Sequence, residues 1–253
     1  MKNRLLASLI LFTRLPFWRL SQPSQQSYSR AVEFWPLVGW LTGGFMAATL
    51  YLAAYVVPYS IAVLLAIIVR LLITGALHED GLADFLDGFG GGGTNRERIL
   101  TIMKDSHIGT YGVLGLILYL ALLFTVLVSM PSDLAALAIV AADPFAKMVA
   151  SQIIVMMPYA RTADTAKNRT VYQRPSTAAG IGLAVQGLLP MAIVLWLMRE
   201  TINWSVVIFT PCFVFYFLYL LIWRRLHGYT GDCCGAVCLL IELTALLCFL
   251  VEI

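Results

Sequence analysis

Four carboxylates lie within nine residues of this chain, at Glu79, Asp80, Asp84 and Asp87. The three aspartates follow the spacing i, i+4, i+7, which places their side chains on one face of a helix. Like charges this close repel one another unless a cation lies among them. Carboxylate oxygens suit Mg²⁺ or Mn²⁺, and Mg²⁺ usually takes one or two carboxylates together with substrate phosphates. The cluster therefore predicts a Mg²⁺–diphosphate site, with Mn²⁺ as an alternative ion.

The residues that follow the acidic cluster offer groups that bind phosphate. Gly88 and residues 90–93 permit close backbone approach to phosphate oxygens, although a glycine run equally suits a flexible hinge. Arg96, Arg98 and Lys104 then supply cations that could meet anionic oxygens, or could be ordinary surface charges. Together these features indicate a catalytic loop over about residues 78–112.

The elements that position this loop are apolar blocks of membrane length. Only 12% of the 253 residues are charged, about half the fraction of a soluble domain. A helix needs ~20 consecutive apolar residues to cross the hydrocarbon core, and lipid leaves helices as the only candidates here. We therefore predict a single all-α, polytopic membrane domain over 1–253. The expected seven helices cover 35–57, 60–77, 112–130, 134–157, 178–198, 203–222 and 235–251.

Basic residues predict how these helices are oriented. Fourteen lie in alternate connections, and the opposite connections contain one, Arg199. The rule that cytoplasmic loops are rich in Lys and Arg places the N-terminus and the catalytic loop in the cytoplasm. The shorter apolar stretch 5–12 is then an interfacial or re-entrant helix. The fourteen residues are Lys2, Arg4, Arg14, Arg19, Arg30, Arg96, Arg98, Lys104, Arg161, Lys167, Arg169, Arg174, Arg224 and Arg225.

Asp143, Lys147 and Arg70 fall within the predicted spans, where charge is costly and is expected to face the bundle interior. Asp143 and Lys147 are spaced i, i+4, so they could pair with each other, or Lys147 could reach a substrate phosphate. Arg70 could extend its head to the interface. At the last span, the spacing favours Asp232 as a helix cap, and the residue could instead complete the metal site.

Several segments, in this order, resemble the cobalamin 5′-phosphate synthase family, whose activity is adenosylcobinamide-GDP ribazoletransferase. The resemblance covers nearly the whole chain, and its most specific part is the segment His78–Gly88, which contains the acidic cluster. The other matching segments are 12–16 (FTRLP), 28–30 (YSR), 36–39 (PLVG), 96–106 (RERILTIMKDS), 108–112 (IGTYG), 158–161 (PYAR) and 229–232 (YTGD) with Gly235-Ala236.

The resemblance implies a Mg²⁺-dependent transferase of the bacterial or archaeal cytoplasmic membrane. A hydroxyl of α-ribazole, or of its 5′-phosphate, attacks the corrinoid-linked phosphate of adenosylcobinamide-GDP, and GMP leaves. The positive loops then face anionic membrane lipid and imply no nucleic-acid partner, and the sequence is compatible with a homo-oligomer.

The implied residue roles are hypotheses motivated by the clustering of these residues. Asp80, Asp84 and Asp87 hold the metal, which makes Asp84 essential. Asp105, or whichever acid is left uncoordinated, accepts the hydroxyl proton. Lys104 acts on the phosphate beside them. Substrate binding falls to His78, Arg14, Arg30, Arg96, Arg98, Lys147 and Asp232.

Two other functions remain open from the sequence. A CDP-alcohol phosphotransferase uses a related acidic motif, but it expects Ala-Arg after Asp-Gly, where this chain has Leu82-Ala83-Asp84. A transporter, as the alternative of a different class, predicts acids near the bilayer midplane and internal pseudo-symmetry. Asp143 is the acid assigned to that depth here, whereas the clustered acids lie at the membrane surface.

Overall fold

The computed structural model describes residues 1–161 and 171–251, and this part of the chain consists of helices without a β-strand. The all-α prediction is thereby confirmed. The longer helices are α3 (Trp35–Ala53), α4 (Tyr59–Thr74), α5 (Leu77–Gly91), α7 (Thr110–Val128), α8 (Ser132–Met156), α9 (Thr177–Leu197), α10 (Trp204–Leu226) and α11 (Gly231–Cys248). The shorter ones are α1 (Lys2–Phe12), η1 (Phe17–Arg19), α2 (Gln25–Tyr28), η2 (Ala31–Phe34) and α6 (Arg96–Ile102).

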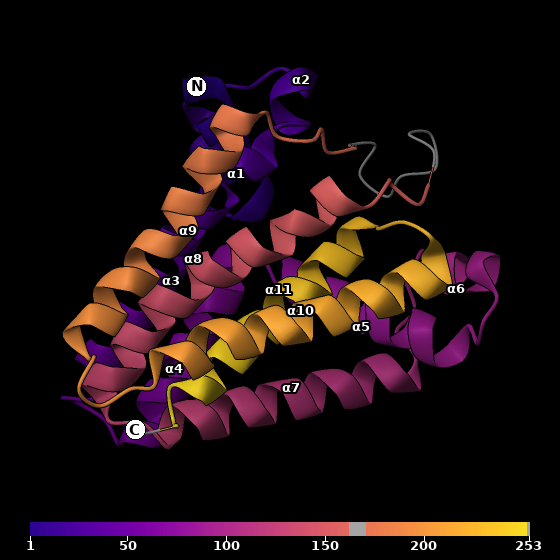
Figure 1. Ribbon diagram of the computed structural model, residues 1–253. Coiled ribbons are helices and arrows are strands. Elements are labelled where there is room, and N and C mark those ends of the chain that lie inside the picture. The colour runs from indigo at the N-terminus through magenta and orange to yellow at the C-terminus, as the bar shows by residue number, and fades with distance from the viewer. Residues whose placement is uncertain (162–170, 252–253) are drawn as a thin grey trace.

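The long helices lie side by side in one bundle, and α1 and α2 lie together at one end of it (Figure 1). Within the described residues, six helices are long and apolar enough to cross a membrane, and a seventh span is possible if α4 and α5 count as one bent pair. The expectation of about seven spans is therefore confirmed as six to seven. These helices fit a multi-pass membrane protein.

A sharp bend separates α4 from α5 and redirects the acidic segment. The two helix axes differ by 89°. Gly75 and Ala76 both adopt left-handed backbone conformations, with φ of 65° and 53°, and so end α4. The Arg14 side chain lies so close to Gly75 that a Cβ there would be 2.2 Å from its Nε. The bend turns α5 back against α7 and α11, so the acidic residues belong to a packed helix.

The segment 78–112 therefore differs from the expected loop, because α5 and α6 occupy most of it. Two of its glycines, Gly88 and Gly92, lie in close helix packing. Gly88 lies inside α5, and a Cβ there would be 2.5 Å from the Met103 side chain. Gly92 closes α5, and a Cβ there would be 2.4 Å from Ile99 of α6. Close helix packing thus accounts for these two glycines.

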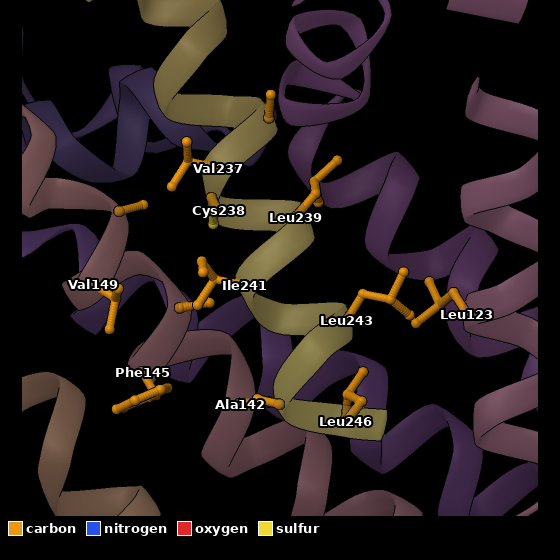
Figure 2. Packing of buried hydrophobic residues seen from close by; sticks show 14 of the residues in the cluster. Leu123, Ala142, Phe145, Val149, Val237, Cys238, Leu239, Ile241, Leu243 and Leu246 are labelled. Atoms are coloured by element: carbon orange, nitrogen blue, oxygen red, sulfur yellow. The ribbon is translucent and has the colours of Figure 1, made fainter. Parts of the chain in front are cut away.

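The bundle has central and peripheral helices. In α8 and α11, 72% of the membrane-length segment is buried, against 22–28% in α7, α9 and α10. Figure 2 shows α11 between α8 and α7, with Leu243 facing Leu123 of α7 and Ile241 on the side of α8. The peripheral helices expose large apolar side chains such as Phe213 and Phe217, as expected where lipid is the solvent.

Arg70 of α4 connects four helices inside the bundle. Its guanidinium donates to Glu242 of α11 at 2.7 Å and to the Tyr119 hydroxyl of α7 at 2.8 Å. Glu79 of α5 lies 3.4 Å away. Arg70 is only 3% exposed, so it faces the interior, as expected for an intramembrane charge, and does not extend to the interface.

Asp143 and Lys147 form an ion pair within α8, which confirms that the i, i+4 spacing brings them together. Both side chains are buried, and the Thr42 hydroxyl of α3 donates to Asp143 at 2.6 Å. The pair therefore joins α8 to α3. Of the two uses considered for Lys147, this arrangement favours the structural ion pair.

Replacing Asp143 alone should destabilise the protein more than removing both charges. Asp143→Leu leaves a buried, unpaired ammonium, which costs about 3–5 kcal/mol and should lower Tm by roughly 10 °C. Asp143→Leu combined with Lys147→Met leaves no orphaned charge, so it should lose less than half as much. Thermal unfolding in detergent measures both variants, and equal losses would contradict the role assigned to the pair.

Candidate active site

A cavity of about 120 Å³ opens at one end of the bundle, where several elements begin or end. It lies between the end of α1, the start of α3, the start of α5, the end of α8 and the start of α11. The lining residues from these elements are Leu11, Phe12, Val32, Trp35, Leu77, His78, Asp80, Ile154, Thr230, Gly231, Asp232, Cys234 and Gly235, with Tyr159, Arg161 and Tyr172 from the connection after α8.

One wall of the cavity is aromatic. The Phe12 and Trp35 rings lie 5.2 Å apart between centroids and within 18° of parallel. The His78 ring continues this arrangement at 5.7 Å from Trp35 and 21° from parallel. Three segments that are distant in sequence therefore form one group of nearly parallel rings.

The same cavity is also lined by two carboxylates, Asp80 from α5 and Asp232 from α11. Their helices approach closely because both lack a side chain at the crossing point. A Cβ at Gly81 would be 3.2 Å from the Asp232 backbone, and one at Gly235 would be 3.3 Å from the His78 backbone. Residues 152 positions apart in the chain thus line one cavity, as the alternative placement of Asp232 at the acidic site requires.

The other expectation for Asp232, that it caps the last helix, is wrong. Thr230 occupies the N-cap of α11, and its hydroxyl accepts a hydrogen bond from the Cys233 amide at 3.3 Å. Asp232 instead lies in the first helical turn, where a negative charge interacts favourably with the helix dipole.

The remaining predicted metal ligands have different surroundings. Asp84 is half-buried, one turn beyond Asp80 on the same face of α5. Asp87 is buried, and its two oxygens accept hydrogen bonds from the Gly109 and Gly112 amides at 2.7 and 2.8 Å. A Cβ on either glycine would be 2.5 Å from this carboxylate. Asp87 therefore holds the start of α7.

The carboxylates fit a metal ion only with further ligands. In residues 1–161 and 171–251, no group of three or more His, Cys, Asp or Glu side chains is placed to hold a metal ion. Mg²⁺ is commonly bound by one or two carboxylates, with waters and substrate phosphates completing its shell. The oxygen donors Asp80 and Asp232, with Asp84 close by in sequence, suit such a substrate-completed site.

A second, open hollow adjoins Arg161. It is lined by α6, by the residues that follow it and by the connection after α8: Arg96, Glu97, Leu100, Thr101, Lys104, Asp105, Ala160 and Arg161. Arg96 donates to the Leu226 carbonyl at 2.8 Å and to the Ala160 carbonyl, so part of its donor capacity is structural. Arg161 lines both hollows and donates to the Leu100 carbonyl at 2.9 Å.

Asp105 is exposed and lies in this second hollow, apart from the residues that line the first cavity. One oxygen lies 2.7 Å from His107 Nδ1 and accepts from the His107 amide at 3.0 Å. These hydrogen bonds, first that of the side chain, hold the pKa of Asp105 below its ordinary value. A carboxyl group with a lowered pKa is a weaker base, which disfavours Asp105 as the proton acceptor.

Four predicted substrate-binding residues line neither hollow. Arg14 lies against the bend at Gly75, and Arg30 lies 3.4 Å from Glu33. Lys147 is paired with Asp143, and Arg98 is exposed on α6. Of the basic residues used to predict orientation, Lys167 and Arg169 lie outside the described residues.

Sequence reasoning missed Trp35, Tyr159 and Arg161 as site residues, although 158–161 is one of the segments that carry the family resemblance. The structure holds this segment against the start of α11. The Ala160 amide donates to the Tyr229 carbonyl at 2.8 Å, and the Tyr229 amide donates to the Pro158 carbonyl at 2.9 Å. Burial raises the pKa of Tyr159 to about 12, so its hydroxyl stays protonated at neutral pH.

The helices of membrane length identify a multi-pass membrane protein. Several of them begin or end around a cavity lined by two carboxylates and an arginine, which forms a polar site at one end of the bundle. Residues 4–250 match the family Cobalamin-5-phosphate synthase. The chain belongs to this family, which confirms the resemblance inferred from the motifs.

Curated relatives share the length of the chain as well as its motifs. A protein of Leptospira interrogans is 34% identical over 93% of this chain and 90% of its own length. Relatives from Shewanella frigidimarina and Vibrio cholerae are 36% and 37% identical, over 98% and 94% of this chain and 93% and 89% of their own lengths. All three are named adenosylcobinamide-GDP ribazoletransferase. No solved structure shows a significant match.

The structural role of Asp87 predicts a stability effect. Asp87→Asn replaces one acceptor oxygen by an amide group, so one N–H at the start of α7 loses its partner at a cost of about 1–3 kcal/mol. Tm should fall, and hydrogen exchange over residues 109–113 should accelerate. Asp133→Asn is the matched control, because Asp133 is exposed in the first turn of α8. Unchanged exchange in the Asp87 variant would rule out this role.

Proposed function

We propose that this protein is an adenosylcobinamide-GDP ribazoletransferase. It joins adenosylcobinamide-GDP to α-ribazole, or to α-ribazole 5′-phosphate, and forms adenosylcobalamin or its 5′-phosphate with release of GMP. The observation that carries the proposal is that Asp80 and Asp232 line one cavity, in a chain that belongs to the Cobalamin-5-phosphate synthase family. The names of the full-length relatives support it.

The reaction exchanges one phosphorus–oxygen bond for another. A ribose hydroxyl oxygen forms a bond to the corrinoid-linked phosphorus, and the bond from that phosphorus to the bridging oxygen breaks. GMP leaves with the bridging oxygen, and the hydroxyl proton passes to a base. Such a transfer depends on positioning and on stabilising negative charge.

Mg²⁺ is the proposed cofactor, with Mn²⁺ able to replace it. Asp80, Asp84 and Asp232 are the residues that would hold it, because all three offer carboxylate oxygens near the contact of α5 with α11. The bound ion would neutralise charge on the diphosphate and on the departing GMP. Asp87 is left out of this set because its oxygens hold the start of α7.

The two hollows suit substrates of different size. The open one, with Lys104 and Arg161 on its walls, leaves room for the bulky corrinoid nucleotide and offers cations to its phosphates. The enclosed cavity receives the smaller nucleoside. Whichever of Asp80, Asp84 and Asp232 is left uncoordinated by the metal accepts the hydroxyl proton, in place of the exposed Asp105.

We also propose that this end of the bundle faces the cytoplasm of a bacterial or archaeal cell, with the helices in its cytoplasmic membrane. The basis is the distribution of Lys and Arg between alternate connections. The cavity lies among the ends of α1, α8 and α11, which adjoin the basic connections.

Asn substitutions at the proposed metal ligands should abolish turnover without unfolding the protein. With adenosylcobinamide-GDP, α-ribazole and Mg²⁺, Asp84→Asn and Asp232→Asn should each slow GMP release at least ~100-fold, since a charged group that stabilises the transition state is lost. Excess chelator should stop the wild-type reaction, and added Mg²⁺ should restore it. Tm in detergent should change little, because neither side chain is fully buried.

Asp133→Asn again serves as the matched control and should retain wild-type turnover, because Asp133 lines neither hollow. Full activity in Asp84→Asn would overturn the metal assignment. Release of CMP from CDP-alcohols, with no GMP release from adenosylcobinamide-GDP, would favour the CDP-alcohol phosphotransferase alternative. Transport of a substrate without any bond change would favour the transporter.

A further inference from the structure

Two polar atoms in the aromatic wall of the cavity lack a hydrogen-bond partner among the described residues. They are Trp35 Nε1 and His78 Nε2. Trp35 is 2% exposed and His78 is 5% exposed, so water reaches neither atom freely. Buried polar groups are nearly always paired, and each unpaired one is costly. Both residues line the same cavity, so a ligand there is the hydrogen-bond partner that we consider for these two nitrogens.

The surroundings of these atoms select the chemistry of that ligand. The cavity wall beside them is built from Phe12 and from the aliphatic side chains of Leu11, Val32 and Ile154. Nearly parallel aromatic rings favour a planar ring that stacks with them. The indole N–H is only a donor, whereas a histidine nitrogen donates or accepts according to its tautomer. The wall thus suits a flat, mostly hydrocarbon ring with an acceptor nitrogen.

We propose that this cavity binds the base of the acceptor nucleoside, and that Trp35 Nε1–H donates to its free ring nitrogen. This inference rests on the proposed function. Ribazole is a benzimidazole riboside, whose base has one unsubstituted ring nitrogen on an otherwise hydrocarbon bicycle. Trp35 and His78 thereby become specificity residues that recognise the base.

Guanine, the other base in the reaction, matches this wall less well. Its edge carries several donors and acceptors, and each one left unpaired against Leu11, Val32 or Ile154 would weaken binding. A benzimidazole needs one polar partner there, and Trp35 offers it. With the base against the aromatic wall, its ribose lies toward Asp80 and Asp232, which can accept hydrogen bonds from hydroxyl groups.

The test changes one atom on each side of the proposed hydrogen bond. Trp35→Phe removes the N–H and keeps an aromatic ring, while the corresponding indole riboside replaces the acceptor nitrogen of α-ribazole by a C–H group. Wild-type protein should bind α-ribazole about tenfold more tightly than the indole riboside. In Trp35→Phe this ratio should fall to near one, because the donor is absent.

Equilibrium dialysis of full-length protein in detergent with radiolabelled ligands measures these affinities, and KM for each substrate is measured by GMP release. Trp35→Phe should raise KM for α-ribazole about tenfold and should change KM for adenosylcobinamide-GDP less than twofold. Trp18→Phe is the matched control, because Trp18 is 47% exposed in η1 and outside the cavity. It should leave both KM values unchanged.

The outcomes separate this inference from the proposed function. An equal preference for α-ribazole in wild type and Trp35→Phe would overturn the hydrogen bond, even if GMP release is normal. A rise confined to KM for adenosylcobinamide-GDP would assign the cavity to guanine and overturn the inference. Absence of GMP release from the wild-type protein would instead overturn the proposed function, while dialysis would still report whether the cavity binds the benzimidazole ring through Trp35.

Discussion

The buried guanidinium of Arg70 is the interaction on which the arrangement of the site depends. It belongs to α4 and contacts Glu79 of α5, Tyr119 of α7 and Glu242 of α11. In an apolar interior, an ionised group is retained only when it is paired and hydrogen-bonded, so these partners cannot separate without leaving a charge exposed to lipid. The bend at Gly75 brings α5 back toward Arg70, and Glu79 fixes the rotation of α5 about its axis. That rotation decides where each following carboxylate points.

The four clustered carboxylates consequently have separate tasks, although the sequence places them within nine residues. Glu79 neutralises Arg70, and Asp87 receives two amides from the start of α7. Asp80 turns to the cavity that Asp232 also lines. The repulsion expected among four adjacent negative charges is thus reduced, because two of them interact with positive charge or with N–H dipoles inside the protein. The proposed metal ion would interact with the remaining two acids, Asp80 and Asp84.

Sequence patterns predicted the helices better than they predicted the environment of each residue. Apolar blocks of membrane length identify spans directly, because lipid imposes length and composition on each helix separately. The glycines near Gly88 disfavour a helix by intrinsic propensity, and packing against Met103 overrides that preference. The role of Asp87 depends on amides more than twenty residues later in the chain. From the sequence, Trp35 is predicted only as the start of a membrane span. Its place beside Phe12 and His78 was not predicted, because no local sequence pattern indicates these contacts.

The position of the cavity at one end of the bundle follows from the same electrostatic constraint. Within the spans, Arg70 and Lys147 are both committed to carboxylates, so neither cation is available to a charged substrate. At the helix ends, water and substrate can solvate Asp80 and Asp232. The N-terminal segments α1 and η2 then cover one side of this end with apolar residues. Apolar and polar side chains therefore line the same cavity, and this combination suits a nucleoside, which has a flat base and a hydroxylated sugar.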